Sequence, residues 1–452
     1  MRVAIIGTGY VGLTTGVCLA FVGHKVMCLD ADEAKVEALK RKKLPIYEPY
    51  LEEVLDEALP NLTFTTNYAE AIPHADVVFI AVGTPPTPSG APNLEYLSQA
   101  AKSIGQHMAT GFTVVVNKST VPIGSGNWVD SLLRDAIAGR ADKSEVSFAV
   151  ASNPEFLREG SALHDSLYPD RIVIGADEAK ALEVLYTLYR PILDQTFSAP
   201  TYLPRPDAMG AVPLLSSDLA SAELIKYAAN AFLALKISFI NEVGLVAERV
   251  GADILEVARG IGLDSRIGPR FLSAGIGWGG SCFGKDTAAL IATAGEYGLN
   301  LPIVESARKI NSRQRDRVVE KLLNELKLLK GRTIGLLGLA FKPNTDDLRE
   351  APAIEIAQKL IDRGVRVKAH DPIAMEKFER EHGKMGVVLC PTPESAAEGC
   401  DALVLVTEWN EYRDLDWDAV GKSMRSPFIL DGRHSLDSEK LVRAGFRYAK
   451  LG

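Results

Sequence analysis

The chain contains little cysteine and little histidine, and neither residue type forms a metal-binding pattern. The five cysteines cannot all pair with one another, and none stands in Cys-x-x-Cys spacing. This usage predicts a reducing compartment, the cytoplasm, and no zinc site. The seven histidines are scattered without ligand spacing, so we expect no bound metal ion of any kind.

An excess of positive charge and a long apolar run are also missing. The net charge of −8 argues against a nucleic-acid partner and against an anionic membrane surface. No run of about eighteen apolar residues occurs, so we expect no transmembrane helix. The first predicted strand starts with the chain, which leaves no room for a signal peptide. A length of 452 residues exceeds one compact core, so we expect a soluble protein of two or three domains.

The first thirty residues carry a glycine pattern in the setting of a dinucleotide site. An apolar run over 1–6 ends in Gly-Thr-Gly-Tyr-Val-Gly at 7–12, a helix-like stretch follows, and a second apolar strand ends in Asp30. The glycines permit a tight turn and close approach to a pyrophosphate, and the acid accepts from the adenosine ribose. Because the charge of Asp30 disfavours a 2′-phosphate, we expect NAD rather than NADP. The alternative is a purely structural glycine-rich turn.

Apolar strands alternate with helix-like stretches over the first 200 residues, which predicts a mostly parallel sheet covered by helices. The expected strands are 3–7, 26–30, 76–82, 113–118, 147–152 and 171–175. Ligands bind at the carboxyl ends of such strands. Three polar loops follow strands there, at 83–86, 118–122 and 153–160. We expect these loops to be functional, although proline and asparagine also favour ordinary turns.

The middle of the chain contains an irregular stretch and then a long helical pattern. Residues 197–217 contain proline and are predicted to be a hinge or surface linker. The pattern from about Leu219 to Val250 is apolar on more than one side, so this helix should be buried against other elements or another subunit. Lys226 and Asn230 lie one turn apart on it and face the same way. Taken alone, Lys226 could simply extend along an apolar stripe.

The C-terminal third repeats the opening pattern in a weaker form. Strands are expected at 332–340, 365–369, 402–407 and 428–430. The glycine turn after the first of them lacks the full fingerprint, so we expect a ligand other than NAD. Phe341, Lys342 and Arg349 follow that strand and Arg433 follows the last one, which makes all four candidates for ligand contacts.

The predicted fold class is therefore α/β, with two Rossmann-like doubly wound domains joined by a long central helix and a helical middle domain. We expect an N-terminal NAD-binding domain over 1–200, a central helical domain over 215–320, and a C-terminal α/β domain over 330–452 whose ligand is not NAD.

One cysteine lies in a setting unlike that of the others. Cys282 stands in a glycine-rich segment, 277–286, with Lys285 and Asp286 three and four residues later. Glycines let the backbone approach a ligand, and a thiolate needs a cation or oriented donors to form near neutral pH. Cys282 is thus a candidate nucleophile, the alternative being a glycine-rich turn with a half-buried cysteine. Small core residues are expected instead at Cys18, Cys28, Cys390 and Cys400.

With these pieces in order, the chain resembles the UDP-glucose/GDP-mannose dehydrogenase family from its first residue to about Arg433. The motifs that carry the resemblance are 7–12, 153–160, 223–232, 266–272 and 279–286. The 266–272 motif followed by Gly-Gly-Ser-Cys-Phe looks more like the UDP-glucose branch than the GDP-mannose or N-acetylmannosamine branches. Two features depart from the family: Gly284 stands where proline is expected, and 198–212 is long and has no assigned role.

The resemblance implies a four-electron, NAD-dependent oxidation of UDP-glucose to UDP-glucuronate. Loss of one hydride leaves an aldehyde, which cannot lose a second hydride until a nucleophile adds to it, and a thiolate does this well. Cys282 would form a thiohemiacetal and then a thioester, which water hydrolyses. Lys226 and Asn230 would stabilise the oxyanion.

The resemblance also assigns the remaining residues. Glu155 would serve as general base, with Thr120 and Asp286 organising water. The expected cofactor contacts are Gly7, Gly9, Tyr10, Val11, Gly12, Asp30, Lys35, Thr84, Ser119, Thr120, Glu159, Lys285 and Arg349. The expected substrate contacts are Glu155, Phe156, Leu157, Lys226, Asn230, Arg266, Phe271, Ser273, Gly275, Gly279, Phe341, Lys342 and Arg433. Because the family's matching arginine reaches into the neighbouring subunit's site, a homodimer or higher homo-oligomer is expected, with 215–320 as the dimerisation domain. The resemblance also implies that the C-terminal domain over 330–452 binds the nucleotide sugar.

Three alternatives stay open at this point. The substrate could be GDP-mannose or a UDP-N-acetylhexosamine. A two-electron dehydrogenase of the 3-hydroxyacid or 6-phosphogluconate type would have no use for Cys282 and would lack a second α/β domain. A non-catalytic sensor of NAD or of a nucleotide sugar would not need Cys282, Lys226 and Glu155 together. The yield of NADH per sugar separates these classes: two, one or none.

Overall fold

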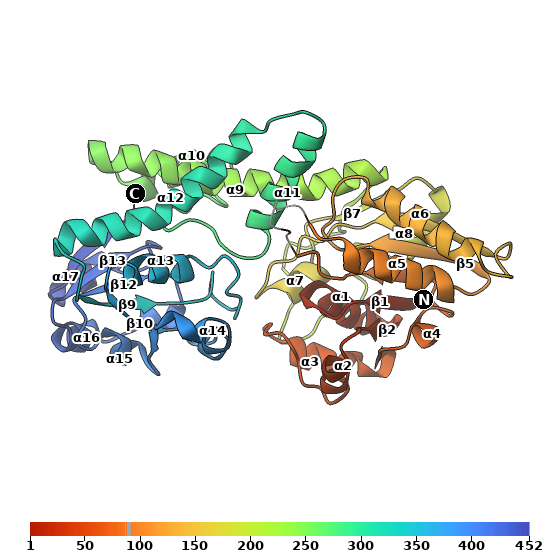
Figure 1. Ribbon diagram of the computed structural model, residues 1–452, viewed down its shortest axis with the longest axis horizontal. Helices are drawn as coiled ribbons and strands as arrows, with labels where there is room; N and C mark the ends of the chain where they lie inside the picture. Colours follow the sequence, from red (N-terminus) through yellow and green to blue (C-terminus); the bar gives the residue numbers. More distant parts are fainter. Residues whose placement is uncertain (86, 88–91, 452) are drawn as a thin grey trace. The chain divides into compact units, whose positions relative to one another are not determined.

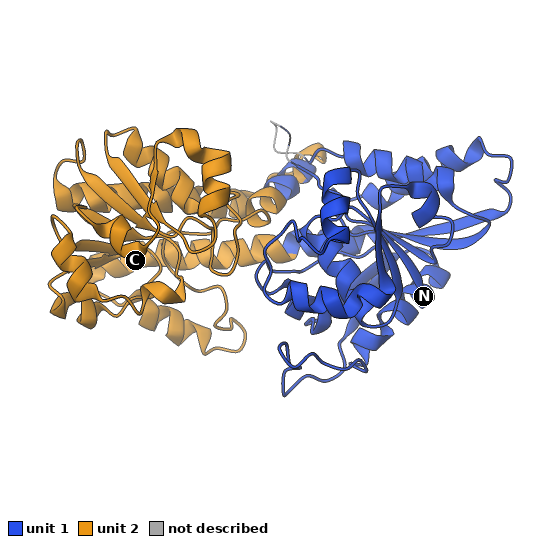
Figure 2. Cartoon of the chain, turned by 90° about the horizontal axis from the view of Figure 1, so that it is seen from below, with its two compact units in different colours: residues 1–228, 288–293 blue, residues 229–287, 294–452 orange. Residues whose placement is uncertain are grey.

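The computed structural model describes residues 1–85, 87 and 92–451. The chain folds as two compact units, unit 1 (1–228 and 288–293) and unit 2 (229–287 and 294–452), which Figure 2 shows in different colours. Each unit has a sheet of mainly parallel strands with helices packed on it (Figure 1). The prediction of an α/β fold with two Rossmann-like doubly wound sheets is confirmed.

Unit 1 is built on an eight-stranded sheet in the order β3-β2-β1-β4-β5-β6-β7-β8. Neighbouring strands are parallel except for the antiparallel pair β6–β7. The chain runs outward from β1 to β3 and then returns to place β4 on the other side of β1. The carboxyl ends of β1 and β4 therefore form the switch point at which such sheets bind ligands. The strands are β1 Arg2–Ile6, β2 Lys25–Leu29, β3 Leu62–Thr65, β4 Val77–Ile80, β5 Gly111–Asn117, β6 Val146–Ser152, β7 Ile172–Ala176 and β8 Leu214–Ser217.

Apolar layers cover both faces of this sheet. Successive strand residues point to opposite faces, so Val3 and Ile5 join one core cluster while Ala4 and Ile6 join another. The layers are completed by helices α1 Tyr10–Phe21, α2 Glu33–Lys40, α3 Leu51–Ala58, α4 Tyr68–Ala71, α5 Glu95–His107, α6 Ser125–Ala138, α7 Ala162–Leu167 and α8 Ala179–Leu193, with a 3-10 turn η1 Leu59–Asn61.

Unit 2 repeats the first six strands of unit 1 in the same spatial order, β11-β10-β9-β12-β13-β14, and every neighbouring pair is parallel. Its switch point lies between the carboxyl ends of β9 and β12. The strands are β9 Thr333–Leu337, β10 Arg366–His370, β11 Val388–Leu389, β12 Ala402–Leu405, β13 Phe428–Asp431 and β14 Arg447–Lys450. The helices are α13 Pro352–Ile361, α14 Met375–His382, α15 Pro393–Ala397, α16 Trp417–Ser423 and α17 Ser438–Arg443, with 3-10 turns η2 Gly383–Met385 and η3 Asn410–Tyr412.

Four further helices lie between the two sheets in sequence: α9 Leu219–Val250, α10 Ile254–Gly262, α11 Phe283–Glu296 and α12 Pro302–Leu326. Helix α9 starts in unit 1 and ends in unit 2. Its length and apolar composition would also suit a membrane span, contrary to the expectation from the sequence, but 39% of its most apolar window is buried and core helices pass the same test. Phe232, Phe239 and Val246 are exposed on it, so burial within this chain is incomplete.

The prediction of a hinge or surface linker over 197–217 agrees with the lack of a helix or strand over 197–213, but it is wrong at the end of the segment. The end of this segment, Leu214–Ser217, is strand β8, which extends the sheet of unit 1 beside β7. Earlier in the segment, Phe197 stacks on Tyr168 with ring centroids 5.8 Å apart, and Tyr202 stacks on Tyr50 at 5.7 Å. These aromatic contacts fix the segment to unit 1. The short strands β3, β11 and β14 were also not predicted.

Candidate active site

The first glycine turn has the backbone that close approach of a ligand requires. Gly7 follows β1 with φ +96°, and a Cβ there would lie 2.7 Å from the carbonyl oxygen of Ala81. Gly9 is the N-cap of α1, and no side chain caps this helix, so its first backbone N–H groups face the turn. Tyr10 and Val11 open the helix. This arrangement fits the pyrophosphate of a dinucleotide at a helix N-terminus.

Asp30 lies at the end of β2, beside this turn. Its Oδ2 accepts hydrogen bonds from the Thr8 backbone N–H at 2.8 Å, the Thr8 hydroxyl at 2.7 Å and the Lys35 ammonium at 2.7 Å. Partial burial alone would raise the pKa of Asp30, but the bonds from Lys35 and Thr8 hold it below its usual value. Asp30 is therefore ionised, which suits a ribose hydroxyl and opposes a phosphate.

The loops after β4 and β5 are joined to each other. The Thr84 hydroxyl donates to the Thr120 carbonyl oxygen at 2.8 Å, and the Ser119 hydroxyl donates to the Val82 carbonyl oxygen at 2.8 Å. The structure thus brings together three expected cofactor residues, Thr84, Ser119 and Thr120, at the switch point of unit 1. Pro86, in the predicted loop 83–86, lies outside the described residues.

The loop after β6 carries a buried ion pair. Glu155 Oε1 accepts from Lys226 Nζ at 2.8 Å, and both side chains are only 6% exposed. Glu155 Oε2 accepts from the Leu157 N–H at 2.8 Å. Burial would raise the pKa of Glu155, but the Lys226 charge and its hydrogen bond lower it. Next to the pair, the Phe156 ring lies 5.5 Å from Lys226 Nζ and 3.7 Å from the Arg171 guanidinium.

A glutamate that the sequence analysis missed links this loop to the glycine turn. The Tyr10 hydroxyl donates to the Glu48 carboxylate, which also accepts from the backbone N–H groups of Gly160 and Ala162, each at 2.6 Å. Burial raises the pKa of Glu48, although these hydrogen bonds oppose the shift. Glu159, one of the expected cofactor residues, precedes this anchored position and is half-buried. Nothing in the sequence around Glu48 signals the contact, because its partners are far along the chain.

Cys282 is the N-cap residue of α11 in unit 2 and is half-buried, with its Sγ 3.6 Å from the Ser281 hydroxyl. A helix N-terminus favours a thiolate. In the first turn of α11, Asp286 is fully buried, its N–H donates to the Cys282 carbonyl oxygen at 2.8 Å, and its Oδ2 accepts from Asn230 Nδ2 at 2.6 Å. The structure therefore joins three of the predicted catalytic residues. Lys285 lies half-buried in the same turn.

The other cysteines lie in a different environment. Burial raises the pKa of the Cys18, Cys28 and Cys400 thiols to about 12. Cys390 is buried as well. The prediction that these four are core residues is confirmed. Among the described residues, Cys282 is the only cysteine that is not fully buried.

The segment before Cys282 needs glycine for space and for conformation. Gly275, Gly277 and Gly280 have φ of +147°, +93° and +87°. A Cβ on Gly280 would lie 2.7 Å from the Phe341 ring, and one on Gly279 would meet the Glu350 carbonyl oxygen. The segment 275–282, which leads to Cys282, is thus packed directly on the loop that follows β9.

Arg433 joins the same segment to the switch point of unit 2. Its Nε donates to the Val406 carbonyl oxygen after β12 at 2.7 Å, and its Nη1 donates to the Gly277 carbonyl oxygen at 2.9 Å. Its Nη2 lies 3.4 Å from the Phe341 carbonyl oxygen, and the Lys342 ammonium lies 5.4 Å from the Phe341 ring. Of the predicted substrate residues, the structure therefore gathers Gly275, Gly279, Phe341, Lys342 and Arg433 within unit 2.

Other predicted residues lie apart from this group. Arg266 has a side chain that is 86% exposed and pairs with Asp264 at 2.6 Å. Ser273 is exposed. Phe271, with φ +64°, packs edge-on against Phe283 at 6.2 Å between ring centroids, beside the start of α11.

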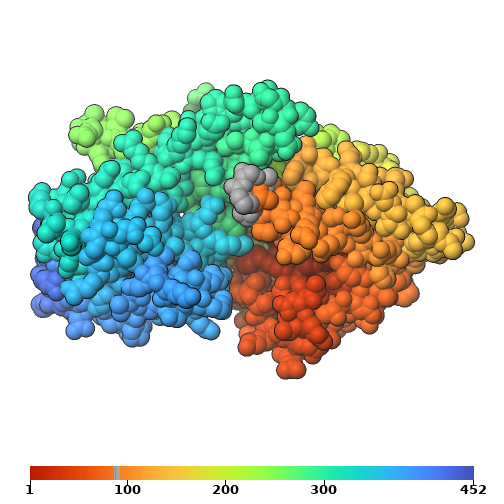
Figure 3. Space-filling view, viewed as in Figure 1, coloured from red at the N-terminus to blue at the C-terminus, as the bar shows by residue number. Residues whose placement is uncertain are grey.

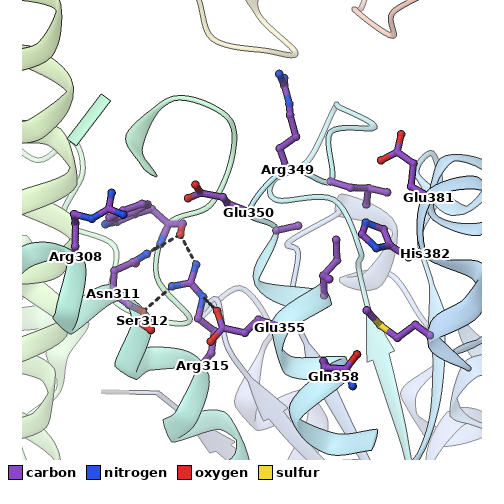
Figure 4. Close-up of a pocket in the computed structure, with 15 residues that line it drawn as sticks. Arg308, Asn311, Ser312, Arg315, Arg349, Glu350, Glu355, Gln358, Glu381 and His382 are labelled. Carbon is purple, nitrogen blue, oxygen red and sulfur yellow. Dashed lines mark hydrogen bonds and ion pairs between the residues drawn. The ribbon is translucent and has the colours of Figure 1, made fainter. Parts of the chain in front are cut away.

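Arg349 borders a separate pocket of about 760 Å³ in unit 2. Its lining comes from Trp278, from α12 and from residues within 348–358 and 381–385. The colours of α12 and of the later stretches adjoin on the surface in Figure 3. At its base Arg315 lies 3.3 Å from Glu355 and donates to the carbonyl oxygens of Asn311 and Trp278, each at 2.8 Å. Figure 4 shows Arg349 directed away from that pair, and it forms an ion pair with Asp347 at 2.7 Å. Arg315 thus holds the backbone of the 277–286 segment through Trp278. The sequence pattern did not predict this contact.

A dinucleotide turn on a Rossmann-like sheet, together with a thiol at the start of helix α11, defines a dinucleotide-dependent oxidoreductase with a candidate covalent nucleophile. Residues 1–193, 220–313 and 335–438 match the NAD binding domain, the central domain and the UDP binding domain of the UDP-glucose/GDP-mannose dehydrogenase family. The chain belongs to this family, and the resemblance found from its motifs is confirmed. The family is one of NAD-dependent oxidoreductases with a domain for a UDP-linked ligand.

Relatives with full-length matches narrow the comparison. The chain is 45% identical to UDP-glucose 6-dehydrogenase TuaD of Bacillus subtilis, covering 100% of this chain and 93% of the relative. It is 44% identical to a UDP-glucose 6-dehydrogenase of Rhizobium meliloti, covering 100% and 99%. A solved UDP-glucose dehydrogenase from Pyrobaculum islandicum matches with a TM-score of 0.89 at 39% identity, covering 100% and 97%.

Among residues 1–85, 87 and 92–451, no group of three or more His, Cys, Asp or Glu side chains is placed to hold a metal ion.

Proposed function

We propose that this chain is a UDP-glucose 6-dehydrogenase that oxidises the sugar's primary alcohol to a carboxylate with two NAD molecules. One observation carries the proposal: Cys282 lies at the start of α11, and Asp286 of that first turn holds Asn230 at 2.6 Å. A two-electron dehydrogenase needs no such thiol. The full-length relatives at 40–45% identity, all UDP-glucose 6-dehydrogenases, support the choice of substrate.

The turn over 7–12 would hold NAD, which would supply the hydride acceptor for each of the two oxidations. The Gly7 and Gly9 backbone gives room for the pyrophosphate and Asp30 takes the ribose. The ionised Asp30 is also the reason to expect NAD in place of NADP, since a 2′-phosphate would meet a carboxylate.

Cys282 attacks the aldehyde carbon, forming a C–S bond and an oxyanion. When a hydride leaves, this thiohemiacetal becomes a thioester. A hydroxide equivalent from water then adds to the thioester carbon, the C–S bond breaks, and the thiolate is regenerated. The helix start at Cys282 and the neighbouring Ser281 hydroxyl favour the anionic sulfur.

Lys226 and Asn230, one turn apart on α9, are assigned to the oxyanion, where a fixed positive charge and an amide donor stabilise developing negative charge. Glu155, held ionised by Lys226, is assigned as the base that removes the proton from the attacking water. Thr120 and Asp286 are assigned to the orientation of that water. On the substrate side, Phe156, Leu157, Phe271, Phe341, Lys342 and Arg433 are assigned to the nucleotide sugar.

We further propose that the chain acts as a homodimer or higher homo-oligomer in the cytoplasm, with residues 215–320 as the dimerisation domain. Phe232, Phe239 and Val246 on α9 are 61%, 50% and 60% exposed, which is costly for apolar side chains that stay in water. The exposed Arg266 is then available to a neighbouring subunit's substrate. Neither a nucleic acid nor a membrane is needed as a partner.

A related nucleotide sugar is the second candidate. A UDP-D-ManNAc dehydrogenase from Pyrococcus horikoshii shares the fold with a TM-score of 0.83, but the identity is only 26%. The deciding experiment gives the purified chain NAD and UDP-glucose, UDP-N-acetylmannosamine or GDP-mannose in parallel, and counts NADH and uronate. We expect two NADH per UDP-glucose and the highest kcat/KM for that sugar. One NADH per sugar, or a higher kcat/KM for another sugar, would refute the proposal.

A further inference from the structure

Unit 1 contains a second buried lysine close to the Glu155–Lys226 pair. Lys118 directly follows β5, and its Nζ donates to Asn153 Oδ1 at 2.9 Å. The same Asn153 oxygen accepts from the Tyr189 hydroxyl at 2.5 Å, and Asn153 Nδ2 donates to the Val173 carbonyl oxygen at 2.8 Å. Asn153 is the first residue of the loop that presents Glu155, so these contacts fix the origin of that loop.

Lys118 and Glu155 line a small cavity together. Its volume of about 10 Å³ is roughly that of one water molecule, and Thr120, Lys226 and Glu223 also line it. The Glu223 carboxylate already accepts from the backbone N–H groups of residues 124 and 126 at 2.6 and 2.8 Å. Tyr227 also lines this small cavity. The titratable groups facing Lys118 here are therefore Glu155, Lys226 and Glu223, and burial raises the pKa of Glu223 to about 7.

A second cavity, of about 70 Å³, lies behind the Glu155 loop and is also lined by Lys118 and Glu155. Its other ionisable lining groups are engaged elsewhere or neutral. Asp165 pairs with Arg158 at 2.5 Å, and Arg171 lies over the Phe156 ring. The Cys18 thiol and the Tyr189 hydroxyl stay protonated because burial raises the pKa of both. Glu155 is thus the anion that Lys118 faces in both cavities.

A buried ammonium is costly, and the hydrogen bond to Asn153 does not account for it. Tyr189 supplies a neutral donor to the same Asn153 oxygen, so a second neutral donor would hold the loop without the cost of desolvating a charge. Burial lowers the pKa of Lys118 to about 8, with the Glu155 charge opposing and the Lys226 charge adding to that shift. The Lys118 charge in turn helps to lower the pKa of Glu155, after the larger influence of Lys226.

We propose that Lys118 is a positioning residue for the general base: it anchors the Glu155 loop through Asn153 and adds a second positive charge that keeps Glu155 ionised. This inference rests on the proposed role of Glu155 in hydrolysis. In that step the water proton passes to the Glu155 carboxylate, the remaining hydroxide bonds to the thioester carbon, and the sulfur of Cys282 leaves as thiolate. A protonated Glu155 cannot accept the proton, so kcat falls on the acid side of its pKa.

Two variants separate the charge of Lys118 from its hydrogen bond. Lys118→Met removes both, whereas Tyr189→Phe removes the other donor to the same Asn153 oxygen and changes no charge. In the dependence of kcat on pH, we expect the acid limb of Lys118→Met to lie about one pH unit higher than that of the parent. At a pH just below the parent's limb, kcat of the variant should therefore be roughly tenfold lower than that of the parent. In Tyr189→Phe the limb should stay in place. The position of a limb does not depend on how much enzyme is correctly folded.

An unmoved limb in Lys118→Met, or an equal shift in Tyr189→Phe, would overturn the inference and leave Lys118 a structural anchor. A second measurement does not depend on turnover. The infrared band of the Glu155 carboxyl is obtained as the difference between each protein and its Glu155→Gln version, and is titrated with acid. Its midpoint should rise in Lys118→Met and stay in Tyr189→Phe, and an unchanged midpoint in Lys118→Met refutes the proposal. If the parent yields no NADH from UDP-glucose, the proposed function fails, while this titration still decides the role of Lys118.

Discussion

The two sheets share a strand order, but they use the turn after the first strand in opposite ways. In unit 1, Gly7 has φ +96° and its N–H donates to the Leu29 carbonyl oxygen at 2.7 Å. In unit 2, Gly338 has φ +100° and donates to the His370 carbonyl oxygen at 2.8 Å. The backbone at this glycine is therefore the same in both units, and the difference must lie in the residues on its C-terminal side.

Two differences from unit 1 make the turn after β9 unsuited to binding a dinucleotide. Ala340 and Pro343 stand where the spacing of unit 1 places Gly9 and Gly12, and no helix begins until Pro352. Asp371, the counterpart of Asp30, is fully buried and accepts from the backbone N–H groups of residues 339 and 340 and from the Trp409 indole. Asp30 also accepts hydrogen bonds from the protein, but its side chain is 14% exposed, whereas Asp371 has no exposed surface and is not available to a ribose. The same sheet topology thus carries a cofactor site in unit 1 and is suited to a different ligand in unit 2.

The largest expected effect tests the chemistry of unit 2. Cys282→Ser should lower uronate formation at least about a thousandfold, the scale for loss of a covalent nucleophile, since an alkoxide forms far less readily than a thiolate. Binding of NAD to unit 1, measured by calorimetry, should change less than about twofold because the substitution is local. Cys390→Ala, at a buried cysteine, is the matched control and should keep its activity. A uronate yield within about tenfold of the parent would contradict the covalent role.

The next effect concerns Lys226, where a structural role and a catalytic role predict different outcomes. Lys226→Met should lower turnover roughly a hundredfold and leave NAD affinity almost unchanged. It should also let a thiohemiacetal or thioester adduct on Cys282 accumulate, which intact-protein mass spectrometry detects. Near-parental turnover with no adduct would make this lysine structural.

Stability must be separated from catalysis in that variant. The Glu155 charge would be left buried without its ion-pair partner, which costs up to about 3–5 kcal/mol of unfolding free energy. The double variant Lys226→Met/Glu155→Gln removes both charges of the pair. It should recover much of the stability in urea melts while staying inactive; recovery of activity as well would mean that the single variant had failed through misfolding.

The third prediction compares Asp30 of unit 1 with its counterpart in unit 2, Asp371. We expect the parent to prefer NAD over NADP by at least about a hundredfold in kcat/KM, because a 2′-phosphate would face the Asp30 carboxylate. Asp30→Asn should narrow that ratio, with Lys35 then free to approach the phosphate. Asp371→Asn should leave the ratio unchanged and lower the melting temperature instead. Equal efficiency of the parent with both cofactors would show that Asp30 does not face the ribose.

The smallest expected effect is a pH dependence of stability. Burial raises the pKa of Glu223 to about 7, against the backbone hydrogen bonds at residues 124 and 126. The folded protein then binds this proton more tightly than the unfolded chain, so Glu223 weakens stability as pH rises between the unfolded carboxyl pKa and about 7. Glu223→Gln should flatten the decline of unfolding free energy over that window by about 1–3 kcal/mol. An unchanged slope in urea melts from acid to neutral pH would argue against this titration.

The predictable part of the site consists of residues whose signal is local in sequence. The 7–12 turn, Asp30 and the segment around Cys282 each combine residue type and spacing within about twenty positions. Arg433 was a candidate from its place after the last strand, and the resemblance supplied the roles of Lys226 and Glu155. Lys118 was predicted only as part of the functional loop 118–122, and Glu48 and Arg315 were not identified, because the importance of these residues comes from contacts with distant residues, such as Gly160 for Glu48. The strand β8 was missed because proline and polar residues precede a short, half-exposed edge strand.

The contrast between Cys282 and the four buried cysteines has a practical consequence. Thiolates attack alkylating reagents, and burial keeps the Cys18, Cys28 and Cys400 thiols protonated well above neutral pH. A single label per chain, placed on Cys282, therefore counts competent active centres without an assay of turnover. The rate of that labelling in the presence of each nucleotide sugar also gives a ranking of ligands by occupancy, independent of whether any of them is oxidised.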